Sequence, residues 1–164
     1  SGAPVQATPT MTPIEFYSGQ ELVDLGASPR LVQLVAATGI AVIKGDESFA
    51  FCSQEGVTTF AGYNTVINAI IICNNHAPPS KVASSFTHEA VHLAQDCKAG
   101  LHNEHLATTD AVTLRNIWDH GLTEAKRENI KHSYDPSDWD VETEAFFFMD
   151  HPETVANAVG NFCF

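Results

Sequence analysis

The sequence HEAVH at residues 88–92 constrains this chain more than any other feature, because it places two histidines and a glutamate within one expected helix. That helix is predicted to run from Lys81 to about Lys98 and to stop at Gly100. Buried polar side chains are costly unless a partner satisfies them. The residues around the motif are mostly apolar, which predicts such burial: Val82, Ala83, Phe86, Leu93 and Ala94.

His88 and His92 are four residues apart, so both imidazoles lie on one helical face and can reach one metal ion. Zinc suits nitrogen ligands and accepts a tetrahedral site of three protein ligands and a water. Glu89 can take a proton from that water, whose pKa the metal lowers. The alternative, a histidine pair on a helix surface, fits poorly with the apolar flanks. We therefore predict Zn2+ as the cofactor, His88 and His92 as ligands and Glu89 as the general base.

The residues before this helix predict a small sheet and two short helices. One helix is expected over residues 14–25, and another over residues 29–37 with Ser28 as its N-cap and Pro29 as its first residue. Turns are expected at residues 45–46, 55–56 and 62–64. The apolar runs between the turns predict strands at residues 40–44, 48–52, 57–61 and 66–73.

The residues after it predict further helices. A helical region is expected over residues 104–132 with a break at Gly121, followed by a helix opened by residues 135–137 and another that starts at Pro152. The order of elements along the chain, with strands first and most helices after them, predicts an α+β fold. We expect one domain over residues 14–164. Residues 1–13 contain three prolines and no periodicity, so a flexible arm is expected there, without the regions of a signal peptide.

The charge balance limits which classes of partner this protein can bind. The formal net charge is −12, from 20 acidic and 8 basic residues, and it argues against nucleic acid and against anionic membrane surfaces. No apolar run approaches the ~20 residues that would span a bilayer. Neutral or basic substrates remain compatible with this charge.

The four cysteines, none of which belongs to a CxxC pair, do not predict a four-cysteine zinc site. Cys52 and Cys73 each end an apolar run and can face one another, while Cys97 and Cys163 can tie the C-terminus to the central helix. Two disulfides would indicate a secreted protein or another oxidising compartment. The alternative is four buried free thiols in a cytoplasmic protein.

A third metal ligand must come from outside HEAVH. The metzincin extension requires Gly and His where this chain has Gln95 and Lys98, so that class is excluded. A downstream helix that carries glutamate is the other common solution, and the sequence DVETEAF at residues 140–146 fits it. Glu142 and Glu144 are both candidates on this helix.

Glu142-x-x-Ala145, some fifty residues after HEAVH, resembles the ExxA helix of gluzincin metallopeptidases such as the minigluzincins and the HtpX/Ste24-like peptidases. The resemblance implies that Glu142 is the third ligand and that Ala145 lets the two helices approach. Larger gluzincins often have Asp at the position of Phe146, so the residue that supports the ligands is not assigned. Glu144 is the alternative ligand; if Glu142 binds the metal, Glu144 is expected to point away, towards solvent or a basic partner.

A second resemblance concerns the substrate. Residues 61–63 and 68–72 resemble the strand and edge strand that precede the active helix of zincins, which implies that a peptide or protein substrate binds along an edge strand near Asn68 and Ala69. His132 and Tyr134 precede the Glu142 helix, where gluzincins often place a residue that stabilises the oxyanion. Either side chain is a candidate for that role.

These features predict a zincin-like α+β domain: a small, mostly antiparallel sheet with an edge strand, a central HEAVH helix and a C-terminal helical part. The predicted activity is that of a zinc metalloendopeptidase that hydrolyses peptide bonds. The alternative is a non-catalytic, zinc-containing regulatory or binding protein of the same fold. A third hypothesis is an interaction module whose acidic face binds a basic partner.

Overall fold

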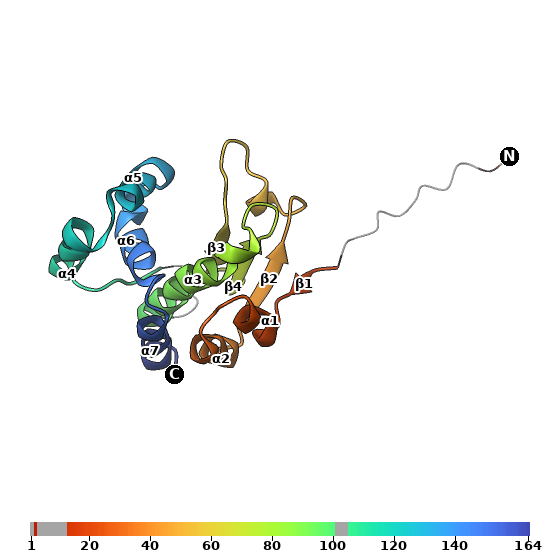
Figure 1. The fold of residues 1–164 in the computed structure, drawn as a ribbon, viewed down its shortest axis with the longest axis horizontal. Helices are drawn as coiled ribbons and strands as arrows, with labels where there is room; N and C mark the ends of the chain where they lie inside the picture. The colour runs from red at the N-terminus through yellow and green to blue at the C-terminus, as the bar shows by residue number, and fades with distance from the viewer. Residues whose placement is uncertain (1, 3–12, 101–104) are drawn as a thin grey trace.

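The computed structural model describes residue 2 and residues 13–100 and 105–164, and it shows an α+β fold (Figure 1). Within these residues the sheet has four strands in the order β1-β2-β4-β3. Strands β2 and β4 are parallel, whereas β1–β2 and β3–β4 are antiparallel, so the sheet is mixed. The strands are β1 (Glu15–Phe16), β2 (Ala41–Gly45), β3 (Ala61–Asn64) and β4 (Ala69–Cys73).

The helices surround one long central helix, α3 (Pro79–Ala99). It crosses the middle of the molecule and contacts β3 and β4 on one side and α6 and α7 on the other (Figure 1). A π-helical turn at Ile117–Gly121 follows α4, and 3-10 turns lie at Ala50–Cys52 and Pro136–Asp138. The other helices are α1 (Gly19–Asp24), α2 (Pro29–Ala37), α4 (Ala111–Asn116), α5 (Glu124–Ser133), α6 (Trp139–Phe148) and α7 (Pro152–Phe162).

The main core lies between the sheet and α3. Every residue of β4 is buried, and so are Phe86, Ala90 and Leu93 of α3. Helices α2 and α7 pack together and contribute buried apolar residues to this core. The apolar residues that flank the motif therefore fix α3 in the interior, as their hydrophobicity predicts.

Local sequence signals located the best-defined helices. Helix α2 begins at Pro29, and the Ser28 hydroxyl accepts a hydrogen bond from the Leu31 amide, as predicted. The predicted α3 is confirmed, although it begins at Pro79 and not at Lys81; it is followed by Gly100, whose φ of 94° favours glycine.

Several short elements differ from the prediction. The helix expected over residues 14–25 is preceded by β1 and begins only at Gly19, and the run at 48–52 forms the turn Ala50–Cys52. The turn expected at residues 62–64 belongs to β3. A Cβ atom on Gly62 would lie only 2.1 Å from the Phe51 ring, so this glycine serves close packing and not a turn.

The predicted flexible arm over residues 1–13 lies almost entirely outside the described residues, and so do His102 and Glu104. Among the described residues, no helix is long and apolar enough to cross a membrane.

Two disulfides, Cys52–Cys73 and Cys97–Cys163, confirm the predicted pairings. The first ties the turn Ala50–Cys52 to the end of β4. The second ties the end of α3 to the residue after α7. Both bonds hold distant parts of the chain against the core, and they indicate an oxidising compartment.

We expect the loss of Cys97–Cys163 to destabilise the protein strongly. This bond closes a sequence separation of 66 residues, and the entropy regained by the unfolded chain corresponds to about 4 kcal/mol. The double variant Cys97→Ser/Cys163→Ser should show this loss in the free energy of unfolding by urea. Its matched control is Cys97→Ser alone, which breaks the same bond and should lose a similar amount. A loss below about 1 kcal/mol in both variants would contradict the prediction.

Candidate metal centre

Helix α3 brings the three polar residues of the motif into one buried group. His88, Glu89 and His92 are all buried, although their side chains are polar. Their ligand atoms lie within 4.8 Å of one another. This group therefore has the composition and proximity of a metal site.

Glu142 approaches the histidines from α6. Its Oε1 lies 2.9 Å from His88 Nε2, and its Oε2 lies 3.0 Å from His92 Nε2. Ala145, one turn further along α6, is completely buried between the helices. The fold thus brings together the four residues on which the sequence analysis based its site, although the role of Glu142 as a ligand stays a prediction.

The spacing of these side chains fits a tetrahedral metal ion. Ligand atoms about 2.1 Å from a zinc ion lie about 3.4 Å from one another. The contacts of Glu142 with the two imidazoles are 0.2–0.5 Å shorter than that, so a small outward movement would admit an ion. Two imidazoles and one carboxylate leave a fourth position for water, as in catalytic zinc sites.

Without a metal, the group is held by charge. Burial alone would lower the pKa of His92, but the Glu142 carboxylate outweighs burial and raises that pKa to about 9. Burial likewise would raise the pKa of Glu142, and the two histidines lower it to about 2. In the metal-free centre, protonated His92 and the Glu142 carboxylate therefore form an ion pair at the position where the metal would bind.

Glu89 and Tyr134 face the same space. Burial raises the pKa of the Glu89 carboxyl, against the opposing effect of His88 and His92. Burial also raises the pKa of the Tyr134 phenol, and the nearby Glu142 and Glu89 carboxylates add to the rise. Tyr134 therefore stays protonated and can donate a hydrogen bond beside the centre.

The group lies in a cleft of about 880 Å3. Its floor is α3, one wall is β3 with the preceding residues 56–60, and the other wall is formed by α5, α6 and Tyr134. In Figure 1, β3 lies on one side of α3, and α5 and α6 lie on the other. His88, Glu89, His92 and Glu142 all line this cleft.

The edge strand differs from the prediction. Asn68 precedes β4, and Ala69 is its first residue; β4 pairs with β2 on one side and β3 on the other, so it is an interior strand. The sheet edge beside the cleft is β3, because the order is β1-β2-β4-β3. The apolar residues 69–73 are all buried, which marks an interior strand and not an edge.

His132, one of the two oxyanion candidates, lies at the rim of the cleft, where its exposed ring contacts the Glu128 carboxylate at 3.3 Å. His105 is exposed as well, and His102 lies outside the described residues. Of the two oxyanion candidates, Tyr134 is thus the one whose environment includes the Glu142 and Glu89 carboxylates.

Glu144 does not point to solvent as predicted. It is buried, and its Oε1 accepts a hydrogen bond from Gln95 Nε2 at 2.9 Å, while its Oε2 accepts one from the Thr109 amide at 2.9 Å. Gln95 in turn lies 2.8 Å from His92 Nδ1. Gln95 was not predicted to contact the centre, although its place one helical turn after His92 is a signal of such contact.

Phe146 also contacts the centre. Its ring packs edge-on against His88 with the centroids 4.6 Å apart. The position at which larger gluzincins often have an acid is therefore occupied by an aromatic ring that packs beside the first histidine.

A family model described as a domain of unknown function (DUF8637) matches residues 42–164. No curated protein and no solved structure matches the chain. The matched residues extend from β2 to the C-terminus and include every residue of the candidate centre.

We expect the metal-free protein to be most stable at mildly acidic pH. The pKa of His92 is raised from 6.5 to about 9, so its stabilisation is complete below pH 6.5 and is lost as the pH rises through 9. The pKa of Glu142 is lowered from 4.5 to about 2, so its stabilisation is complete above pH 4.5 and is lost towards pH 2. Urea unfolding in chelator from pH 3 to pH 10 measures both limbs.

The matched variant is Glu142→Gln, which removes the charge but keeps the shape. It should flatten the decline between pH 6.5 and pH 9. An unchanged decline in this variant would contradict the assigned pair.

Proposed function

This chain belongs to the DUF8637 family, and we propose that it is a zinc-dependent peptidase in which His88, His92 and Glu142 hold the metal. The observation that carries the proposal is the position of Glu142, whose carboxylate contacts the Nε2 atoms of both motif histidines at the floor of an open cleft. The combination resembles that of gluzincin peptidases. A metal site that served stability alone would not need such a cleft.

Zinc bound there would polarise the scissile carbonyl and lower the pKa of a bound water. Glu89 accepts the proton of the attacking water and passes it to the leaving amine. Burial suits it to this task, because it raises the pKa of the carboxyl and so makes the carboxylate a stronger proton acceptor. Tyr134 donates a hydrogen bond to the substrate oxygen that becomes negative, and its raised pKa keeps the phenol protonated.

A peptide is the substrate that the cleft walls favour. The strand β3 lines the cleft and is an edge strand, so its outer side offers backbone groups to an extended chain. The substrate would add as one more strand and place its scissile bond over α3. The net charge of −12 is compatible with neutral or basic peptides.

We expect one zinc ion per chain. Elemental analysis after dialysis measures the content, and His88→Ala or His92→Ala should remove the ion, while Glu142→Ala should weaken its binding by at least an order of magnitude. The matched control is Asp140→Ala, an exposed carboxylate on the same helix that should bind zinc as the unmodified protein does. Zinc retained by a variant that lacks both histidines would overturn the assignment.

We expect Glu89→Gln to keep zinc but to lose turnover by 10²–10⁴-fold, the usual contribution of a general base. The measurement is cleavage of a mixed peptide library by the zinc-loaded protein, followed by mass spectrometry. Near-normal turnover in Glu89→Gln would exclude this mechanism. An unmodified protein that binds zinc but cleaves no peptide would favour the alternative, a non-catalytic zinc protein.

A further inference from the structure

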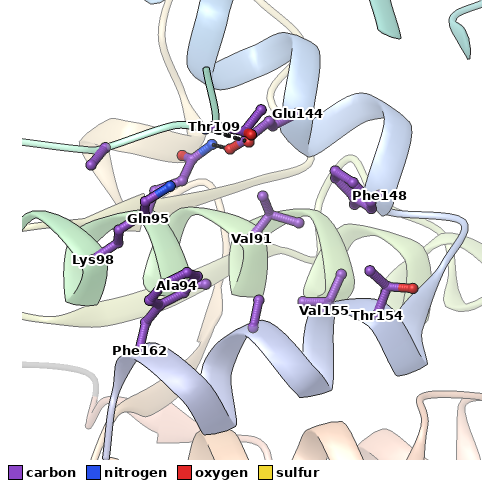
Figure 2. A pocket seen from close by; sticks show the side chains of 12 residues that line it. Val91, Ala94, Gln95, Lys98, Thr109, Glu144, Phe148, Thr154, Val155 and Phe162 are labelled. Carbon is purple, nitrogen blue, oxygen red and sulfur yellow. Dashed lines mark hydrogen bonds between the residues drawn. The ribbon is translucent and has the colours of Figure 1, made fainter. Parts of the chain in front are cut away.

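Gln95 links the two helices that carry the candidate centre. Its Oε1 lies 2.8 Å from His92 Nδ1 on α3, and its Nε2 donates to the Val141 carbonyl at 3.1 Å and to Glu144 at 2.9 Å, both on α6. Gln95 is only 3% exposed. Figure 2 shows Gln95 directed from α3 towards Glu144, with Thr109 beyond it; the same residues border a second, mostly apolar pocket of about 230 Å3.

The partners of Gln95 determine the proton on His92. A carbonyl oxygen accepts only, so the Gln95 atom that faces Val141 and Glu144 must be the amide nitrogen. The amide oxygen therefore faces His92 Nδ1, and this pair needs a proton on Nδ1. In neutral His92 the lone pair then lies on Nε2, the atom beside Glu142. The network thus selects the tautomer that a metal at Nε2 requires.

The same amide sets the position of α6. Val141 and Glu144 flank Glu142 in sequence, so the two hydrogen bonds from Gln95 hold the backbone carbonyl before Glu142 and a side chain after it. Glu144 is itself held by the Thr109 amide at 2.9 Å. Gln95 therefore acts on two ligands at once, although it touches neither the substrate nor the metal.

We propose that Gln95 is a positioning residue of the metal centre, which fixes the His92 tautomer and holds α6 where Glu142 meets the two histidines. This inference rests on the proposed assignment of His92 and Glu142 as ligands. Partners of metal-bound histidines typically contribute 10–100-fold to metal affinity.

The experiment compares Gln95→Leu with Thr143→Ala. Thr143 is 3% exposed on α6 and donates only to the Trp139 carbonyl within its own helix, so its loss perturbs the same helix without touching His92. Competition of the metal-free proteins with a chromophoric chelator measures zinc affinity. We expect Gln95→Leu to lose 10–100-fold and Thr143→Ala to stay within about threefold.

A second variant separates polar positioning from packing. Gln95→Glu alone brings two carboxylates together and should weaken zinc binding. In Gln95→Glu/Glu144→Gln, the carboxylate introduced at position 95 accepts from His92 Nδ1–H, and the amide introduced at position 144 donates to it and still accepts from Thr109. The exchange leaves the Val141 carbonyl without its donor, so it should recover only part of the zinc affinity that Gln95→Glu loses. Nitrogen-15 NMR of the zinc-loaded proteins should show protonated His92 Nδ1 in the unmodified protein and in the exchanged variant.

Each outcome bears on a different claim. Equal zinc affinity in Gln95→Leu and Thr143→Ala would overturn the inference, and so would an exchanged variant that is no better than Gln95→Glu. If the unmodified protein bound no zinc, both this inference and the proposed function would fail. If the Gln95 effects were as expected but no peptide were cleaved, the positioning role would stand and the proposed peptidase activity would fail.

Discussion

The contact between Glu142 and the two motif histidines is the interaction on which the arrangement of this domain depends. Charged and strongly polar side chains in an interior are costly unless they are paired. HEAVH commits three such side chains to the buried face of α3, and Glu142 adds a fourth group from α6. Helix α6 cannot leave α3 without exposing unpaired polar groups to an apolar interior. For α6, this requirement adds to the hydrophobic packing against α3.

The sequence predicted those parts of the molecule in which each residue has one dominant role. Pro29 and Gly100 mark helix boundaries because of their backbone geometry, and both boundaries were predicted from these residues. The cysteine pairings were also found from local context, since Cys52 and Cys73 end neighbouring apolar runs. The grouping of Glu142 with the histidines was predicted because the downstream glutamate helix resembles the one that gluzincins use.

The features that the sequence did not predict depend on contacts between distant residues. Gly62 looked like a turn residue. It lies in β3, and its lack of a side chain leaves room there for the Phe51 ring. The apolar run that ends in β4 looked like an edge strand, yet the pairing with β2 and β3 buries it. Glu144 was expected to face solvent or a basic partner, because nothing in its neighbourhood in the sequence revealed the amides of Gln95 and Thr109. Local sequence patterns reveal the periodicity of helices and strands and the residues that cap helices. They do not reveal which distant residue will form a hydrogen bond with a buried polar group.

Helix α3 also connects the metal centre to the proposed substrate strand. One turn after His92, Asp96 is completely buried and accepts a hydrogen bond from the Tyr63 hydroxyl of β3 at 2.6 Å. Burial and this carboxylate raise the pKa of the Tyr63 phenol, so the proton of the bond stays on Tyr63. The edge strand is therefore tied to the helix that carries His88 and His92, and helices of this length are stiff. The distance from an added peptide strand to the candidate metal position is thus set by α3 and not by the surrounding loops, which suits chemistry that tolerates little misplacement.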